Sequence, residues 1–387
     1  RMKKLSLKSF VLPFLSFFLA IFIGGLLIAF SDPKVLKLRG DFLEMIRVGA
    51  NTAWSAYVAL FQGAIYDPNL AAKGGGQGFY PLSETLVVSG PLILAGLAVA
   101  LAFRAGLFNI GAQGQFIFGA IGASYVGFAF DLPVVLHVIA ALAFGIFLGG
   151  IWGGIAGLLK AKTGAHEVIV TIMLNYVAAN FILWLLNTET FLREGRTDPI
   201  APEVLPNSRL PKFFGEEFRV SAAIVIALLV AWLVSVLLDR TTWGYQFKAV
   251  GANATAAKTA GMSVPFVMTS VMIVCGGIAG LGGAVNVLGA EYALTTGVAG
   301  SFGFDAITVA LLGRAKPLGV VFSAFLFAGL RVGGQMMQAR TDTPLDLILI
   351  VQALIILFIA APALVKGIFR LKNISSSTGM AAKGWNG

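Results

Sequence analysis

The sequence is poor in the side chains from which metal and catalytic sites are usually built. It has one cysteine and two histidines among 387 residues, and only 12% of the residues are charged. The single cysteine, Cys275, lies in an apolar run, so a disulfide framework and a cysteine metal site are excluded. His166 and Glu167 do not begin an HExxH motif, because position 170 is Val. We expect no metal and no cofactor.

Motifs of ATP hydrolysis and acyl transfer are also missing. The chain has no GxxxxGK[ST] phosphate loop and no GxSxG nucleophile elbow, so it is not expected to be an enzyme and no residue is predicted to be catalytic. Its apolar runs lack the dense carboxylates of proton relays, which indicates that a separate subunit supplies energy. Two alternatives remain open. Transport by an ion-coupled secondary carrier would survive ATP depletion, and a passive, channel-like membrane protein would be indifferent to ATP and to ion gradients.

Apolar residues dominate what is present. They make up 58% of the chain and give a mean hydropathy of +0.88, which predicts an all-α, polytopic membrane helix bundle. At about 20 residues per crossing, the predicted spans are residues 10–30, 85–103, 107–130, 133–159, 167–187, 220–238, 265–290, 318–338 and 345–365. A tenth run, 303–313, is too short to cross at 1.5 Å per residue and is predicted to be a half-helix.

The distribution of basic residues predicts the orientation. With the N-terminus inside and the ten segments alternating, sixteen of the 28 Lys and Arg residues lie on the cytoplasmic side. They are Arg1, Lys3, Lys4, Lys8, Arg104, Lys160, Lys162, Arg240, Lys248, Lys258, Arg314, Lys316, Lys366, Arg370, Lys372 and Lys383. Both termini are then cytoplasmic. The net charge of +10 does not indicate nucleic-acid binding, because the basic residues form no patch with an aromatic platform.

This topology divides the chain into a cytoplasmic N-terminus (1–9), a transmembrane domain (10–372) and a disordered tail (373–387). Two extracytoplasmic segments are predicted, 31–84 and 188–219. The first contains an amphipathic piece, residues 41–66, suited to the outer membrane surface, and the second is rich in Pro and mixed charge. Either segment is a solvated linker or a landing surface for an extracytoplasmic binding protein.

A polar, basic segment, residues 239–264, separates two spans and has the features of a cytoplasmic docking loop. Its second half predicts a short helix, with Asn253 as N-cap, Ala254 to Ala260 as helix formers and Gly261 at the C-terminal end. We expect the docking contacts at Gly244, Val250, Gly251, Asn253, Ala256, Ala257 and Gly261.

Glycines and polar residues inside the spans indicate where helices pack closely and where a solute path could run. Gly145, Gly149, Gly153 and Gly157 recur every four residues, which predicts a helix-packing seam. Polar groups gather in the glycine-broken stretch FRAGLFNIGAQGQF (103–116), on one helix face formed by Glu167, Thr171 and Asn175, and along the stripe Arg331, Gln335 and Gln338. Such groups form hydrogen bonds between helices or line a wet path. The candidate path residues are Asn109, Gln113, Gln115, Thr171, Asn175 and Asn286.

Four stretches carry a family resemblance: AFRAGLFNIGAQGQFIFGAIGASYVGF (102–128), GAHEVIVTIMLNYVA (164–178), GYQFKAVGANATAAKTAGMSV (244–264) and SFGFDAITVALLG (301–313). The chain resembles permease subunits of bacterial ABC importers of the branched-chain amino acid and simple sugar group, over about residues 82–365. The first two stretches are most similar to nucleoside-uptake permeases. The docking loop has Asn-Ala-Thr-Ala-Ala where other importers have Glu-Ala-Ala.

The resemblance implies a subunit of about ten helices in the bacterial cytoplasmic membrane. It implies two cytoplasmic ATPase subunits at the docking loop, an extracytoplasmic substrate-binding protein, and a second permease that is either a copy of this chain or a relative. Nucleosides are the expected substrates, since neutral amides bind a base or ribose without imposing a charge. A simple sugar or a branched-chain amino acid remains the alternative.

Overall fold

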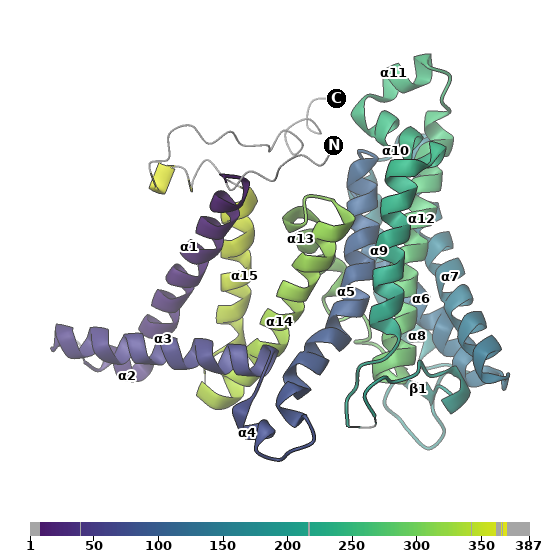
Figure 1. Ribbon diagram of the computed structural model, residues 1–387. Coiled ribbons are helices and arrows are strands. Elements are labelled where there is room, and N and C mark those ends of the chain that lie inside the picture. Colours follow the sequence, from purple (N-terminus) through teal and green to yellow (C-terminus); the bar gives the residue numbers. More distant parts are fainter. Residues whose placement is uncertain are drawn as a thin grey trace. The chain divides into compact units, whose positions relative to one another are not determined.

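The computed structural model describes residues 8–38, 40–215, 217–341, 343–360, 365 and 367–369. The predicted tail, 373–387, and most of the predicted N-terminal segment, 1–9, lie outside these residues. The described chain is mostly helical (Figure 1) and divides into two compact units. Unit 1 contains the residues up to Thr85 and those from Gly329 onward, and unit 2 contains Leu86–Ala328.

The helices follow the predicted order. They are α1 (Lys8–Ser31), α2 (Pro33–Leu36), α3 (Phe42–Ala64), α4 (Pro68–Ala71), α5 (Tyr80–Arg104), α6 (Ala112–Ala129), α7 (Val134–Thr163), α8 (Glu167–Leu185), α9 (Ala223–Arg240), α10 (Thr242–Ala252), α11 (Ala254–Thr259), α12 (Val264–Asn286), α13 (Phe302–Leu312), α14 (Pro317–Thr341) and α15 (Leu345–Ala360). Single turns η1 (Gln77–Phe79), η2 (Pro206–Ser208) and the π-helical η3 (Val287–Glu291) join them, with two strands, β1 (Ile200–Glu203) and β2 (Ala293–Thr295).

Six helical stretches of the described chain are long and apolar enough to cross a membrane: Gln77–Arg104, Val134–Thr163, Glu167–Leu185, Ala223–Arg240, Val264–Glu291 and Pro317–Thr341. Shorter apolar helices cover Leu15–Ser31, Phe302–Leu312 and Leu345–Ile355. The all-α membrane bundle is confirmed, and α13 matches the predicted half-helix. The third predicted span, 107–130, corresponds to α6, which is shorter than that run because residues 105–111 form a non-helical turn.

Helices α7 and α12 form the predicted glycine seam in unit 2. A Cβ added to Gly149 would lie 2.5 Å from the carbonyl oxygen of Gly276 and 2.6 Å from Cα of Gly280. No side chain fits between backbones this close, so glycine is required on both helices. Gly150, the next residue on α7, is not part of this contact, because its added Cβ would meet Ile273 at an ordinary 3.4 Å.

The segment after α8 folds into a cap at one end of unit 2. Strand β1 pairs antiparallel with β2, and the Val204 amide donates to the Tyr292 carbonyl at 2.9 Å. The Leu210 amide donates to Leu288 at 2.9 Å, and the guanidinium of Arg209 lies 4.7 Å from the centre of the Tyr292 ring. The segment 188–219 is therefore held against the end of α12 and is not a free linker.

Five of the thirteen Lys and Arg residues of unit 2 (Arg193, Arg196, Arg209, Lys212 and Arg219) lie in the cap segment 188–219, and the other eight lie at the end that carries α10 and α11. At this end the Arg104 side chain donates to the Ala315 carbonyl at 2.8 Å, and the backbone of Gly251 contacts that of Gly106. Lys160, Lys162, Arg240, Lys248, Lys258, Arg314 and Lys316 also belong to the helix ends and turns on this side. This excess has the direction that the predicted orientation requires, and the orientation itself stays a prediction.

Unit 1 packs α1 against α3 and α15. The Tyr57 hydroxyl on α3 donates to the Ile21 carbonyl at 2.6 Å, and burial raises the pKa of Tyr57 to about 12. Arg340 pairs with the buried Asp67, and its second nitrogen donates to Gln62 at 2.6 Å. Sequence patterns gave no signal for this pair, because its members are far apart in the chain.

Helix α3 forms within the predicted amphipathic piece. Asp41 caps it by accepting from the Glu44 amide at 3.1 Å. Its buried positions are small, including Ala56 and Ala59, while Phe42 and Trp54 are exposed. An exposed apolar face on an amphipathic helix is typical of the membrane interface.

Candidate functional site

The turn between α5 and α6 (105–111) is the centre of the polar cluster. Gly106 takes a left-handed conformation with φ +71°, which glycine adopts without steric cost. The Asn109 side chain accepts from the Gly111 amide at 3.1 Å and so closes the turn before α6 begins. The broken helix predicted from the glycine-rich stretch is present at these residues.

Two buried side-chain amides, one in this turn and one in the first turn of α6, bond to each other. Asn109 Nδ2 donates to Gln115 Oε1 at 2.9 Å, and Gln115 Nε2 donates to Asn109 Oδ1 at 3.0 Å. Both side chains are almost completely buried. A reciprocal amide pair satisfies polar groups that would be costly to bury alone.

Asn175 reaches from α8 and clamps the same turn. Its Oδ1 accepts from the Gly114 amide at 2.8 Å, and its Nδ2 donates to the Ile110 carbonyl at 2.9 Å. One side chain thus holds two of the backbone groups that the break in the helix leaves unpaired. Thr171, one turn earlier on α8, donates to the Glu167 carbonyl at 2.7 Å, and the predicted face of Glu167, Thr171 and Asn175 is the buried face of α8.

Gln113 connects α6 to the start of α13. Its Nε2 donates to the Gly300 carbonyl and its Oε1 accepts from the Gly303 amide, both at 2.7 Å. The Asn286 amide near the end of α12 donates to the Val298 carbonyl at 3.0 Å. Half-buried Gln113 is the most accessible of the six candidate path residues, since the other five are buried.

All six candidate path residues therefore make hydrogen bonds within unit 2. Asn109, Gln115 and Asn175 come together at the turn 105–111, while Gln113 bonds to the start of α13, and Asn286 and Thr171 bond to their own neighbouring segments. The contact of these six residues with substrate stays a prediction.

The docking segment forms two short helices. Thr241 caps α10 by accepting from the Gly244 amide at 3.1 Å, and Asn253 caps α11 by accepting from the Ala256 amide at 2.9 Å. Gly261 has φ +84° and follows α11, as predicted from the sequence. The capped helix and its terminal glycine are confirmed.

The seven predicted docking residues divide by exposure. Gly244, Val250 and Ala257 are buried, so they hold α10 and α11 on unit 2. Asn253, Ala256 and Gly261 are exposed and free to meet a partner. Gly251 is half-buried against the turn that begins at Arg104: its added Cβ would lie 2.6 Å from the Arg104 carbonyl oxygen and 2.7 Å from the Gly106 nitrogen.

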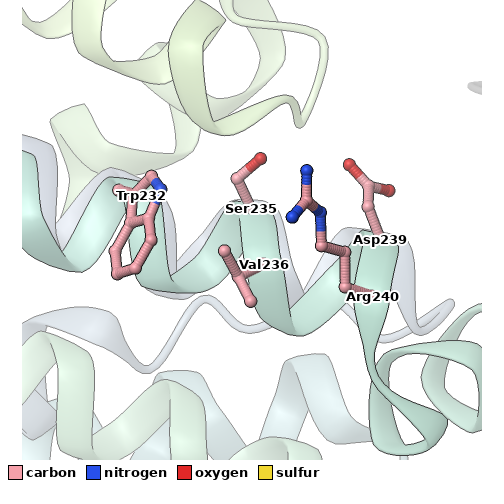
Figure 2. A pocket seen from close by; sticks show the side chains of 5 residues that line it. All are labelled: Trp232, Ser235, Val236, Asp239 and Arg240. Atoms are coloured by element: carbon pink, nitrogen blue, oxygen red, sulfur yellow. The ribbon is translucent and has the colours of Figure 1, made fainter.

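A pocket of about 330 Å³ lies beside the end of α9 (Figure 2). Its lining side chains are Trp232, Ser235, Val236, Asp239 and Arg240. Asp239 also pairs with Lys248 of α10 at 3.5 Å, so the pocket belongs to the α9–α10 corner and not to the amide cluster.

Within the described residues, no group of three or more His, Cys, Asp or Glu side chains is placed to hold a metal ion. Cys275 is buried within α12. Together the bundle, the seam and the capped polar segment define a multi-pass membrane protein with a surface suited to a peripheral partner.

The comparisons with known proteins identify the class. Residues 82–360 match the family of branched-chain amino acid transport system permease components, and the chain belongs to this family. It is the membrane-spanning, non-catalytic permease subunit of an ABC importer, a class that works with ATPase and substrate-binding partners.

Named relatives cover most of the chain. The guanosine ABC transporter permease protein NupP of Bacillus subtilis is 38% identical over 328 residues, 84% of this chain and 91% of that protein. The nucleoside ABC transporter permease protein NupB of Lactococcus lactis is 31% identical over 349 residues, 88% of this chain and 92% of its own. The glucose ABC transporter permease protein TsgB13 of Haloferax volcanii is 34% identical over 291 residues, 72% of this chain and 76% of its own. No solved structure matches the chain.

Proposed function

We propose that this permease subunit translocates nucleosides into the cell. The observation that carries the proposal is the similarity to the guanosine permease, which extends over 84% of this chain at 38% identity. The polar groups of the cluster are compatible with a neutral substrate, because they include the amide pair of Asn109 and Gln115 and the half-buried amide of Gln113. Neutral amides offer both donors and acceptors to a base or a ribose.

A simple sugar is the second candidate substrate. The glucose permease relative, at 34% identity over 72% of the chain, supports it, and amides also bind sugar hydroxyls. The guanosine permease is favoured because it matches more of both chains.

In this proposal the end of unit 2 that carries α10 and α11 faces the cytoplasm. The excess of Lys and Arg at that end, eight residues against five in the segment 188–219, supports the orientation, since basic residues are retained on the cytoplasmic side. The folded cap with β1 and β2 then faces outward, where a binding protein would deliver the substrate. Both chain termini are cytoplasmic in this arrangement.

The exposed side of α11, with Asn253, Ala256 and Gly261, is the proposed contact for a cytoplasmic ATPase subunit. The backbone contact of Gly251 with Gly106 links this segment to the turn held by Asn175. A movement of α10 driven by ATP binding would thus be transmitted to the polar cluster. A second permease, either a relative or a copy of this chain, would complete the path.

The test is ATP hydrolysis by the reconstituted importer in proteoliposomes. The complete assembly, with its ATPase subunits and binding protein, is supplied in turn with guanosine, adenosine, cytidine, glucose and leucine. We expect nucleosides to stimulate hydrolysis and to be taken up, while glucose and leucine do neither. Stimulation by glucose alone would replace the proposed substrate with the second candidate.

A further inference from the structure

Helix α8 exposes a face whose chemistry differs from that of the neighbouring α7. Its buried side, with Thr171 and Asn175, packs toward α6. Another side presents Tyr176, 65% exposed, and Trp184, 61% exposed, together with the exposed Asn180. Spacings of four and eight residues place these three side chains on one face.

The exposed faces of neighbouring helices are hydrocarbon. From Val134 to Leu159, every exposed residue of α7 is Val, Leu, Ile, Ala or Phe, and Ile151 is 46% exposed. On α9 the exposed positions from Val225 to Leu233 are aliphatic except for Trp232. Such faces suit lipid chains, which offer no hydrogen bonds.

The exposed side of α8 also carries the apolar Met173, Val177 and Leu183, but its polar groups lie deep in the span, where lipid cannot satisfy them. Tyr176 is nine residues from Leu185 and nine from Glu167, about 14 Å from either end at the helical rise. Asn180 lies one turn further along. A polar side chain at this depth faces a wet cavity or another protein surface, because exposure to hydrocarbon is costly.

These groups keep hydrogen-bonding capacity for a ligand. Asn180 Nδ2 donates to the Tyr176 carbonyl at 2.8 Å, and within the described residues no hydrogen bond is made to the Asn180 amide oxygen or by the Tyr176 hydroxyl. The six candidate path residues, by contrast, all bond to the protein itself. The accessible polar groups of α8 thus lie on a different side of the helix from Asn175, about 100° and 140° around its axis for Tyr176 and Asn180.

A row of aromatic side chains continues from this face to α6 and α7. The Trp184 ring lies 5.5 Å from Phe181, which lies 5.3 Å from Phe118, and Phe118 stacks on Trp152 at 3.8 Å. The indole nitrogen of Trp152 is buried with no hydrogen-bond partner in the described part of the chain. Aromatic side chains stack on nucleobases whatever the base, because every base has a π-face.

We propose that the face of α8 formed by Tyr176, Asn180 and Trp184 lines the translocation path and contacts the nucleoside during transport. The aromatic rings stack on the base, and the Asn180 amide bonds to its polar edge. This inference rests on the proposed function, since it names the residues of that path. The occupant is a solute carrying a planar, hydrogen-bonding ring system.

Cysteine labelling of the assembled importer tests the inference directly. The natural Cys275 is buried and gives little background, so Tyr176→Cys and Asn180→Cys each add one reactive thiol. The probe is a charged methanethiosulfonate reagent, which reacts only where a thiol meets water, because the thiolate is the reactive form. Ile151→Cys on the hydrocarbon face of α7 is the matched control.

We expect both α8 cysteines to be labelled at least about tenfold faster than Ile151→Cys, since thiolate formation requires water, and guanosine to slow their labelling. Labelling as slow as that of the control would overturn the inference, as would labelling that appears only in the isolated permease, because the second permease would then cover the face. Labelling slowed by glucose and not by guanosine would overturn the nucleoside contact.

Uptake measurements separate this inference from the proposed function. If the unaltered importer takes up guanosine, the proposed function stands whatever the labelling result. Asn180→Leu is then expected to lower the maximal uptake rate by about tenfold, the size of one hydrogen-bonded contact, and Asn180→Gln to restore most of it. Unchanged uptake by Asn180→Leu would contradict the α8 contact.

Discussion

The contact between Gly251 of the docking segment and the turn 105–111 leads to a specific prediction. A methyl group at Gly251 would lie 2.6 Å from the Arg104 carbonyl oxygen and from the Ala105 carbonyl carbon, and 2.7 Å from the Gly106 nitrogen. All three are backbone atoms, which cannot swing away as a side chain would. Gly251→Ala must therefore push α10 away from the turn 105–111.

The expected size of the effect follows from overpacking. Extra methyl groups in well-packed regions cost about 1–3 kcal/mol, which corresponds to about a 5- to 150-fold change in an equilibrium. If the contact transmits the movement of α10 to the turn 105–111, the substitution weakens the coupling between the two segments by that factor. We expect the variant to reach the membrane, to retain basal ATP hydrolysis with its ATPase partner, and to lose most nucleoside uptake.

The assay is uptake of labelled guanosine together with ATP hydrolysis by the assembled importer, normalised to the amount of permease in the membrane. Gly297→Ala is the control, because its added Cβ meets nothing within 4 Å. Uptake by Gly251→Ala equal to that of the control would refute the coupling through the 105–111 turn.

Three further predictions concern stability and the loop between α8 and β1. Gly149→Ala should lower the melting temperature of the detergent-solubilised protein, since overpacking costs about 1–3 kcal/mol, whereas Gly150→Ala on the same helix should leave it nearly unchanged; equal melting temperatures would contradict the seam. Asn175→Ala should also destabilise the protein, by about 1–3 kcal/mol for each backbone group left unpaired, and a melting temperature like that of the unaltered protein would show that the clamp adds nothing. In the loop between α8 and β1, the hydrogen bond from Arg196 holds the pKa of Asp198 below its usual value. The pair therefore stabilises the loop above the ordinary carboxyl range, and this stabilisation is lost as the pH falls through the lowered pKa. Hydrogen exchange of that loop should quicken at low pH in the unaltered protein and be fast at neutral pH in Asp198→Asn; exchange that is independent of pH would contradict it.

Helix positions were predictable from the sequence because long apolar runs leave few alternatives. Helix α9 begins three residues after its predicted start, and the Asn253 cap and Gly261 lie where turn chemistry required them. Helix α5 begins at Tyr80, five residues before its predicted start, because η1 leads directly into it. Boundaries shift where local hydrogen bonds extend a helix past its apolar run.

The candidate site was predictable only in part. Periodicity placed Thr171 and Asn175 on one face of α8, and that face is buried against α6. In a helix that is apolar on nearly every side, sequence does not reveal which polar face bonds to a neighbour and which remains accessible. Asn180 and Tyr176 were not singled out for this reason.

The folded cap was missed because its order comes from contacts distant in sequence. The segment 188–219 reads as polar loop, yet β1 pairs with β2 some ninety residues later, and Arg209 stacks on Tyr292. Such pairings leave no local sequence pattern, because helices α9 to α12 separate the two partners in the sequence.

Uptake of labelled guanosine by cells that lack this chain, compared with cells in which it is restored, tests the central claim most directly. The account predicts that the restored chain brings back guanosine uptake and that ATP depletion abolishes it. Restored uptake of glucose or leucine without guanosine would contradict the substrate, and guanosine uptake that persists after ATP depletion would contradict the transport mechanism.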